Sequence, residues 1–212
     1  MPVVISSNSS QSSRNSIRKA IRQARRDITP EQQAQYASAA ATLSISALHK
    51  LNVSKVALYL TNDGELDTKP LIEALWQAGI EVYLPRLHPF SVGNLIFLRY
   101  DKNTQLQQNS LNIWEPKLDI TQMILAHELD VVITPLVAFD KQGNRMGMGG
   151  GYYDRTLANW QTIGRPMPIG YAHDCQQVDS LPCEHWDVPL PVIVSPSAIY
   201  EYQPLAAAIP AS

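Results

Sequence analysis

Short apolar segments that alternate with segments of helical periodicity constrain the fold of this chain most. Lys55–Leu60, Ile80–Leu84 and Asp130–Thr134 have the length and the β-branched content of buried strands. Between the first two lies Thr68–Ala78, which carries Pro near its start and stops before Gly79, as a helix does. This alternation predicts a mostly parallel sheet covered on both faces. We therefore expect an α/β fold with three layers, α/β/α.

Two further helices are predicted before the first strand. From Arg14 to residue 28, isoleucine and alanine recur at steps of three and four, which marks one apolar face. Thr29 suits an N-cap, Pro30 the first helical position, and Gln32 can complete a capping box. The second helix is expected to run to about His49. Later elements are expected as strands at Asn94–Tyr100, Pro168–Tyr171 and Val192–Val194 and helices at Asp119–His127 and Tyr152–Trp160.

The length of 212 residues and the element pattern indicate one catalytic domain over residues 14–203. Residues 1–13 are rich in Ser, Asn and Gln and are expected to be a disordered tail, and residues 204–212 a loose C-terminal tail. The first 26 residues hold five arginines and no acid, a composition that also suits a transit peptide. The amphipathic helix explains the arginines better than a transit peptide does, so we expect a cytoplasmic protein. We also expect it to be a monomer.

Charge and hydropathy disfavour two classes of partner. The formal net charge is −2, whereas a protein that binds the nucleic-acid backbone usually presents a net basic surface. The chain has no apolar run near the roughly 18 residues that a membrane span needs. Neither nucleic acid nor membrane is therefore expected as a partner.

The two cysteines, Cys175 and Cys183, could form a disulfide, but two reduced thiols of a cytosolic protein are the preferred interpretation. Together with His173 and His185 they could also hold zinc. Each His–Cys pair has only one residue between its members, which is tighter than usual ligand spacing, so the zinc hypothesis is disfavoured.

The segment Phe139–Arg155 contains the densest functional signal. Its glycines, which allow backbone N–H groups to approach a ligand, stand just before a predicted helix: Gly147, Gly149, Gly150 and Gly151. The loop matches neither a P-loop nor a complete dinucleotide fingerprint, and a plain surface loop is the alternative. Arg145 can bind phosphate through its forked guanidinium, and Asp154 can offer Mg²⁺ an oxygen ligand. The segment thus favours a nucleotide–metal site.

The arginines of the first helix form a second candidate. Arg14, Arg18, Arg22 and Arg25 share one face, which is often simply solvated; alternatively, the first two could close over a triphosphate. Because ligands of such folds bind beyond the carboxyl ends of the strands, the loops at residues 61–67 and 135–151 are the expected site.

Four pieces in this order resemble the 5-formyltetrahydrofolate cyclo-ligase (5,10-methenyltetrahydrofolate synthetase) family. They are Arg14-Asn-Ser-Ile-Arg18, Leu58–Thr68 (LYLTNDGELDT), Leu129–Pro135 and Asn144–Asp154 (NRMGMGGGYYD). The resemblance covers residues 14 to about 202. It implies that ATP phosphorylates the formyl oxygen of 5-formyltetrahydrofolate and that N10 then closes the ring to 5,10-methenyltetrahydrofolate, a reaction that depends on positioning and electrostatics.

The resemblance also implies roles for individual residues. ATP-binding residues would be Arg14, Arg18, Arg145, Gly147, Gly149, Gly150, Gly151 and Tyr153. Substrate-binding residues would be Leu60, Glu65, Met148, Gly149, Gly150, Gly151 and Tyr152. Arg145 and Tyr152 would act in catalysis, and Asp154 and Asp187 would bind Mg²⁺ as the cofactor.

Many family members carry basic residues within the glycine loop, where this chain has Met148 and Gly150. Phosphate contacts would then come from backbone N–H groups and from the arginines. Tyr152 is expected to contact the ligand, whereas Trp114 and Trp160 are expected to pack in the core. Two alternatives stay open: another ATP-dependent reaction on this scaffold, and a folate-binding protein without catalysis.

Overall fold

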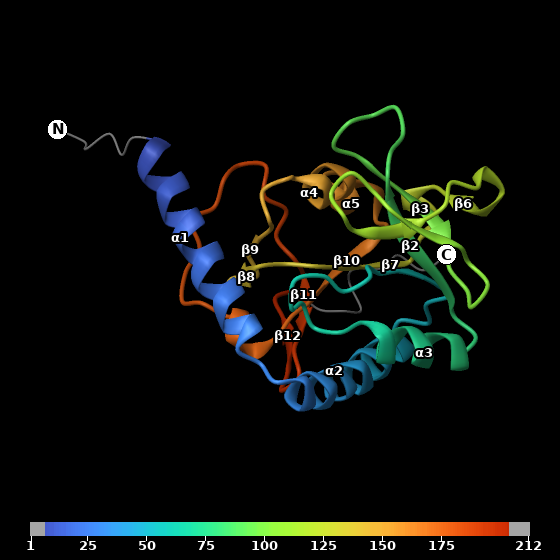
Figure 1. The fold of residues 1–212 in the computed structure, drawn as a ribbon, viewed down its shortest axis with the longest axis horizontal. Helices are drawn as coiled ribbons and strands as arrows, with labels where there is room; N and C mark the ends of the chain where they lie inside the picture. The colour runs from blue at the N-terminus through green and yellow to red at the C-terminus, as the bar shows by residue number, and fades with distance from the viewer. Residues whose placement is uncertain (1–6, 204–212) are drawn as a thin grey trace.

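The computed structural model describes residues 7–203 and has the three layers expected from the sequence (Figure 1). A central sheet separates α2 (Pro30–Lys50) and α3 (Lys69–Gln77) on one face from α4 (Tyr152–Leu157) and α5 (Trp160–Ile163) on the other. The predicted α/β class with a mostly parallel sheet is confirmed. Of the expected tails, residues 1–6 and 204–212 lie outside the described residues.

The sheet has eight strands in the order β12-β11-β10-β7-β1-β2-β3-β6. Its parallel centre runs from β11 to β2, and the outer pairings with β12, β3 and β6 are antiparallel. The strands are β1 (Lys55–Ala57), β2 (Glu81–Leu87), β3 (Leu95–Arg99), β6 (Met123–Ile124), β7 (Val131–Thr134), β10 (Met167–Tyr171), β11 (Val192–Val194) and β12 (Ile199–Glu201). In β1 and β7, Val56 pairs with Val131, and in β7 and β10, Ile133 pairs with Ile169.

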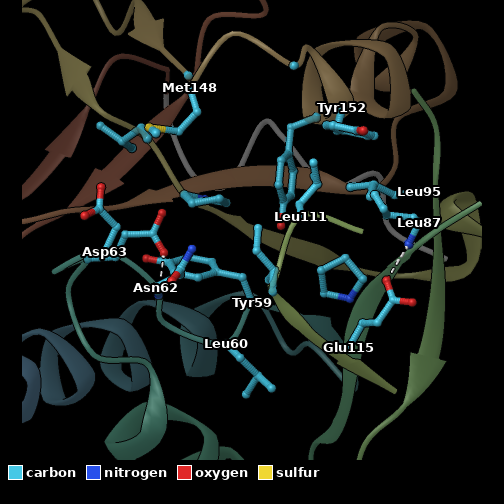
Figure 2. Close-up of a pocket in the computed structure, with 18 of the residues that line it drawn as sticks. Tyr59, Leu60, Asn62, Asp63, Leu87, Leu95, Leu111, Glu115, Met148 and Tyr152 are labelled. Atoms are coloured by element: carbon cyan, nitrogen blue, oxygen red, sulfur yellow. Dashed lines mark hydrogen bonds between the residues drawn. The ribbon is translucent and has the colours of Figure 1, made fainter. Parts of the chain in front are cut away.

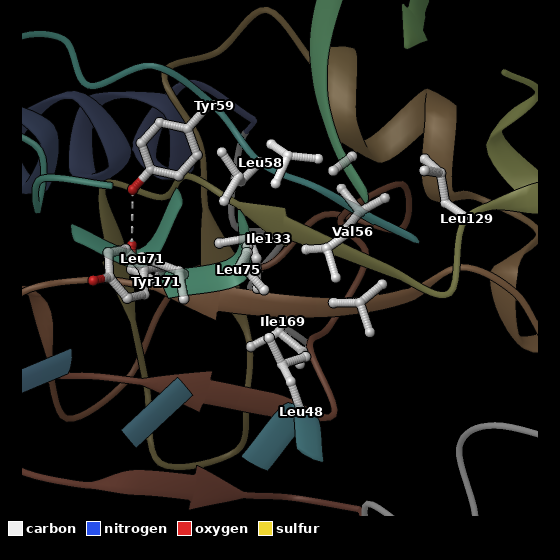
Figure 3. Close-up of a cluster of buried hydrophobic side chains, with 14 of the residues drawn as sticks. Leu48, Val56, Leu58, Tyr59, Leu71, Leu75, Leu129, Ile133, Ile169 and Tyr171 are labelled. Carbon is white, nitrogen blue, oxygen red and sulfur yellow. Dashed lines mark hydrogen bonds between the residues drawn. The ribbon is translucent and has the colours of Figure 1, made fainter. Parts of the chain in front are cut away.

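The core lies where the parallel strands meet α2 and α3 (Figure 3). Every residue of β7, β10 and β11 is buried, because helices or loops cover both faces of these strands. The hydroxyl of Tyr59 donates to the carbonyl of Tyr171 inside this core at 3.3 Å. Trp160, at 5% exposure, packs in the core as predicted.

The second helix begins as its sequence predicts. Thr29 Oγ1 accepts a hydrogen bond from the N–H of Gln32 at 3.3 Å, and the Gln32 side chain accepts from the N–H of Thr29 at 3.0 Å. Pro30 occupies the first turn, where its missing N–H costs nothing. The predicted capping box is confirmed.

The first helix, α1 (Ser7–Arg26), starts seven residues before the expected Arg14. Extension of an existing helix by Ser, Asn and Gln costs only a few tenths of a kcal/mol per residue, which is far less than nucleation. Local bonds support the extension: the Ser16 hydroxyl donates to the carbonyl of Ser12 at 3.0 Å. The expected disordered tail is therefore wrong for residues 7–13.

Two expected helices differ in the structure. Residues 119–127 form 3₁₀ turns at Ile120–Gln122 and Ala126–Glu128, because Met123–Ile124 between them pairs with β3. The expected helix Tyr152–Trp160 is interrupted after Leu157, and the second piece starts at Trp160.

Short strands outside the main sheet were not predicted. They form two pairs, β4 (Leu106–Gln108) with β5 (Trp114–Pro116), and β8 (Ala138–Phe139) with β9 (Arg145–Met146). None of the described helices is both long and apolar enough to cross a membrane.

Candidate functional site

Two adjoining cavities, of about 530 and 570 Å³, lie on either side of the glycine loop, and the first is lined by residues that follow the carboxyl ends of β1 and β7. We call them the first and the second cavity. Gly150, Gly151 and Asp154 line both, so the glycine loop forms their common wall. The expectation of a site at the loops after β1 and β7 thus agrees with the position of the first cavity.

The first cavity is mainly apolar. In Figure 2, Asn62 and Asp63 lie at one end and Leu87 and Glu115 at the other. Most of the expected substrate residues line it: Leu60, Glu65, Met148, Gly150, Gly151 and Tyr152. Three further residues for which the resemblance implies ATP binding also line the first cavity: Arg145, Gly147 and Tyr153.

The loop after β1 holds Glu65 by backbone hydrogen bonds. The N–H of Asn62 donates to Glu65 Oε2 at 3.0 Å, and Gln33 donates to the carbonyl of Glu65 at 2.6 Å. The hydroxyl of Thr68 closes the loop by donating to the carbonyl of Tyr59 at 2.7 Å. Burial raises the pKa of the Glu65 carboxyl to about 7, and the Asn62 N–H and the charge of Arg25 oppose this only in part. Glu65 can therefore accept or donate a proton near neutral pH.

The glycine loop itself requires glycine at specific positions. Gly149 and Gly151 have φ values of 106° and 64°, in the left-handed region that side chains disfavour. Arg18 of α1 donates from Nε to the carbonyl of Gly147 at 3.0 Å. Arg155 donates to the carbonyl of Gly150. Two guanidiniums thus bind loop carbonyls and leave the loop N–H groups available for an anion.

Arg145 and Asp154 form a buried ion pair at the boundary of the cavities. Arg145 Nη2 donates to Asp154 Oδ1 at 2.6 Å, and the N–H of Val188 donates to the same oxygen at 3.1 Å. Arg145 is 4% exposed, and its Nε has no partner among the described residues. Burial lowers the pKa of this guanidinium, while the charge of Asp154 raises it. The pair fixes a cation beside the wall that the two cavities share.

Asp187 lines the second cavity and is held by Arg14. Arg14 donates from Nη1 to Oδ2 at 2.7 Å and from Nη2 to Oδ1 at 3.2 Å, and the N–H of Glu184 donates to Oδ2 at 2.9 Å. The hydrogen bond to Asp187 is the main factor that raises the pKa of Arg14. Arg14 is therefore an ion-pair partner in the structure rather than part of a solvated helix face.

The residues present fit a magnesium ion that is shared with phosphate. Asp154 and Asp187 both line the second cavity, and no described residue donates to Asp154 Oδ2. Within residues 7–203 no group of three or more acidic, His or Cys side chains could hold a metal. Mg²⁺ typically takes only one or two carboxylates and completes its shell with phosphate oxygens and water. Two carboxylates beside an anion loop meet that requirement.

The zinc hypothesis and the disulfide find no support from the positions of these side chains. Cys175 and Cys183 are both free and exposed, whereas His173 is 1% exposed. The His185 ring lies edge-on to Trp186, with the ring centroids 4.6 Å apart.

Sequence reasoning missed part of the first cavity. Trp114 was expected in the core, and this is wrong: it is 53% exposed and lines the cavity from the β4–β5 pair. Glu115 next to it forms an ion pair with Arg86 of β2 at 2.7 Å, which fixes that hairpin against the sheet. Arg25 also lines the cavity, although its place on a basic face gave no sign of this. Residues 106–116 (LQQNSLNIWEP) do not alternate regularly between apolar and polar types, so no local pattern indicated this hairpin.

Comparisons with known proteins agree with this geometry. The model of the 5-formyltetrahydrofolate cyclo-ligase family matches residues 10–196. The 5-formyltetrahydrofolate cyclo-ligase of Escherichia coli K12 is 56% identical over 182 residues, which are 86% of this chain and 100% of the relative. The enzyme of that name from Haemophilus influenzae is 49% identical over 84% of this chain and 94% of its own length.

Solved structures are similar as well. The NMR structure of Aquifex aeolicus 5,10-methenyltetrahydrofolate synthetase superimposes with a TM-score of 0.76 at 26% identity, over 90% of this chain and 93% of that one. A 5,10-methenyltetrahydrofolate synthetase from Mycoplasma pneumoniae gives a TM-score of 0.68 at 25% identity, over 86% and 98%.

Proposed function

The chain belongs to the 5-formyltetrahydrofolate cyclo-ligase family and is an enzyme of that class, and from this premise we propose how its two cavities convert 5-formyltetrahydrofolate to 5,10-methenyltetrahydrofolate. The folate occupies the first cavity, and ATP places its phosphates in the second. One observation carries this assignment: Gly150, Gly151 and Asp154 line both cavities. A phosphoryl group can therefore pass between two substrates without leaving the site.

The reaction has two steps. The formyl oxygen on N5 attacks the γ-phosphorus of ATP, the bond between that phosphorus and the bridging oxygen breaks, and ADP leaves. N10 then attacks the activated carbon, the N10 proton goes to solvent, and phosphate leaves as the N5–C–N10 bridge forms. Formation of the phosphate ester is needed because an amide oxygen is a poor leaving group.

The residues of this chain position and neutralise the reacting groups. The backbone N–H groups of the glycine loop, Arg18 beside Gly147 and the buried Arg145 would stabilise the charge that develops on the transferred group. Arg145 acts by charge and by donation from its unpaired Nε, which supports its assignment as catalytic. Tyr152 lines the first cavity, where its ring can contact the folate. Glu65 can accept hydrogen bonds from ring nitrogens of the folate.

Asp154 and Asp187 would hold Mg²⁺ at the second cavity. When bound, the ion would neutralise phosphate charge and orient the triphosphate for in-line transfer. The ion pairs with Arg145 and Arg14 hold both carboxylates in place before the nucleotide arrives.

We further propose that the enzyme acts as a cytoplasmic monomer that needs neither nucleic acid nor membrane. The two exposed free thiols suit a reducing compartment. Several arginines of α1 are already paired with Asp63 and Asp187, which leaves less free charge for a nucleic-acid backbone. Light scattering of the purified protein at several concentrations tests the monomer.

The deciding experiment follows the methenyl chromophore and released phosphate with 5-formyltetrahydrofolate, ATP and Mg²⁺. We expect both products in equal amounts, and neither when ATP or Mg²⁺ is left out. A folate-binding protein without catalysis would bind the folate without phosphate release. A related enzyme with another substrate would give neither product from this folate.

A further inference from the structure

Three arginines of α1 converge on one carboxylate at the first cavity. Arg22 Nε lies 2.6 Å from Asp63 Oδ2, Arg26 Nη2 lies 2.7 Å from Oδ1, and Arg25 Nη2 lies 3.4 Å from Oδ2. Asp63 lies in the wall of the cavity, beside Asn62 (Figure 2). One negative charge is thus shared by three positive charges, and a net positive charge remains at this end of the cavity.

Arg25 differs from its two neighbours in burial and in bonding. The side chains of Arg22 and Arg26 are 38% and 53% exposed, whereas that of Arg25 is 1% exposed. The Nε and Nη1 atoms of Arg25 are buried and have no hydrogen-bond partner among the described residues. Burial of a charged donor without an acceptor carries a larger desolvation cost than burial of a neutral one.

Anchoring of α1 does not account for Arg25. Arg22 and Arg26 already attach the helix to Asp63 with shorter bonds, and they do so from the surface. The weak 3.4 Å contact of Arg25 adds little to this attachment, while its burial leaves two nitrogen atoms unsatisfied. An acceptor that arrives with a ligand would remove this cost.

Glu65, which lines the same cavity as Arg25, indicates which polar groups that ligand would carry. Glu65 lines the same cavity and is close enough for the charge of Arg25 to act on it. Glu65 Oε2 accepts from Asn62, while no described residue donates to Oε1. A donor-only group and a carboxylate oxygen without a donor among the described residues therefore line the same cavity.

We propose that Arg25 is a specificity-determining residue, which donates a hydrogen bond from one of its two unpaired nitrogen atoms to the ring carbonyl oxygen at C4 of the folate. The inference rests on the proposed function, because it takes the folate as the ligand of the first cavity. The edge of a pterin ring presents a carbonyl acceptor, a ring N–H donor and an amino donor in sequence. The guanidinium matches the acceptor, and Glu65 matches the two donors.

A 4-amino pteridine has a donor where the pterin has its carbonyl. Arg25 has no acceptor to offer it, so a buried N–H would face a buried N–H. The site is therefore expected to reject 4-amino analogues of the folate.

The test compares 5-formyltetrahydrofolate with its 4-amino counterpart in wild-type protein and in Arg25→Met. We expect the variant to bind the 4-oxo ligand about tenfold to a hundredfold more weakly, the loss of a hydrogen bond to a charged group. Binding of the 4-amino ligand should change little or become tighter. Equal weakening of both ligands would indicate a structural role and overturn the proposal, as would no change in either.

Arg26→Gln is the matched control. It also removes one positive charge from the Asp63 cluster, but at an exposed position of the same helix. In this variant, the ratio of the affinity for the 4-oxo ligand to the affinity for the 4-amino ligand should stay at the wild-type value. If it falls as far as in Arg25→Met, the net charge of the cluster rather than Arg25 sets the preference, and the proposal fails.

A second variant covers the case in which Arg25→Met does not fold. Arg25→Gln retains a donor and adds an acceptor for a 4-amino group, so its affinity ratio should fall clearly below that of the wild type. An unchanged ratio contradicts the inference. Wild-type turnover is measured first: if no methenyl product forms, the proposed function fails, whereas normal turnover with an unmoved ratio refutes only the role of Arg25.

Discussion

Asp187 accepts two hydrogen bonds from the guanidinium of Arg14, at 2.7 and 3.2 Å, although 173 positions separate the two residues in sequence. Their side chains are 10% and 7% exposed. The pair joins the first helix to the segment that lines the second cavity. It therefore serves both the stability of the fold and the position of a proposed metal ligand.

Breaking this pair is expected to cost stability. Arg14→Ala leaves the Asp187 carboxylate poorly compensated and should lower the free energy of unfolding by about 2–4 kcal/mol. Urea denaturation of Arg14→Ala, Asp187→Ala and the double variant measures the coupling. The double variant should lose less than the sum of the single losses. Additive losses would show that the pair contributes no coupling energy.

Asp154→Asn is expected to weaken the use of Mg²⁺. The change removes the charge of a proposed metal ligand and of the partner of Arg145, so the Mg²⁺ concentration for half-maximal activity should rise at least about tenfold. Calorimetry of Mg²⁺–ATP binding gives an independent readout. Asp179→Asn is the control, since Asp179 is 96% exposed and pairs with Lys141. An unchanged Mg²⁺ requirement in Asp154→Asn would remove Asp154 from the metal site.

The pKa of Glu65 predicts a specific dependence of stability on pH. Folding raises this pKa to about 7, so the folded state favours the protonated carboxyl over the ionised one. The stabilisation by the protonated carboxyl is fully present below about pH 4.5 and is lost as the pH rises through 7. Glu65→Gln abolishes this loss, so above pH 7 the variant should gain on the order of 1–3 kcal/mol relative to wild type. Its activity should nevertheless fall, since Gln keeps only one acceptor oxygen and places an NH2 donor where the proposed site needs the second acceptor.

Denaturation curves at several pH values check this prediction. Glu73→Gln, on the exposed side of α3, is the control and should follow the wild-type profile. A Glu65→Gln profile parallel to that of the wild type would mean that Glu65 titrates normally in the folded protein.

Two exposed tryptophans are expected to report the two ligands separately. Trp114 is 53% exposed and lines the first cavity, and Trp186 is 57% exposed and lines the second. Folate should change the emission of Trp114, and ATP that of Trp186, because each ligand replaces the water around one ring. Trp114→Phe should lose the folate signal but keep the ATP signal, and Trp186→Phe the reverse. Loss of both signals in one variant would contradict the assignment of the cavities.

The sequence predicted the elements whose signals are local. The capping box of Thr29 and Gln32 depends on residues three positions apart, and the stop of α3 at Gly79 depends on a φ of 73° that glycine adopts easily. The buried strands β7, β10 and β11 followed from runs of apolar residues. For these elements the sequence pattern and the final environment require the same thing.

Long-range pairing decided what the sequence did not predict. Residues 123–124 became a strand because Ile124 pairs with Phe97, and this pairing overrides a weak helical pattern. Trp114 is a large aromatic residue of the kind that usually packs in a core, yet the β4–β5 hairpin places it at a cavity. Neither outcome depends on neighbours within one turn of the chain.

The fold class, the glycine loop and the resemblance to the cyclo-ligase family could be predicted from the sequence alone, because backbone propensities and motif residues act over a few positions. The separate roles of the arginines of α1 became clear only from the folded structure. Four arginines one turn apart look alike in sequence, but burial and distant acids separate them. Arg14 pairs with Asp187, Arg18 binds the glycine loop, Arg22 holds Asp63, and Arg25 is buried in the cavity wall with two nitrogen atoms that have no partner among the described residues. Desolvation and ion pairing depend on what the fold brings near, and that is set by contacts far apart along the chain.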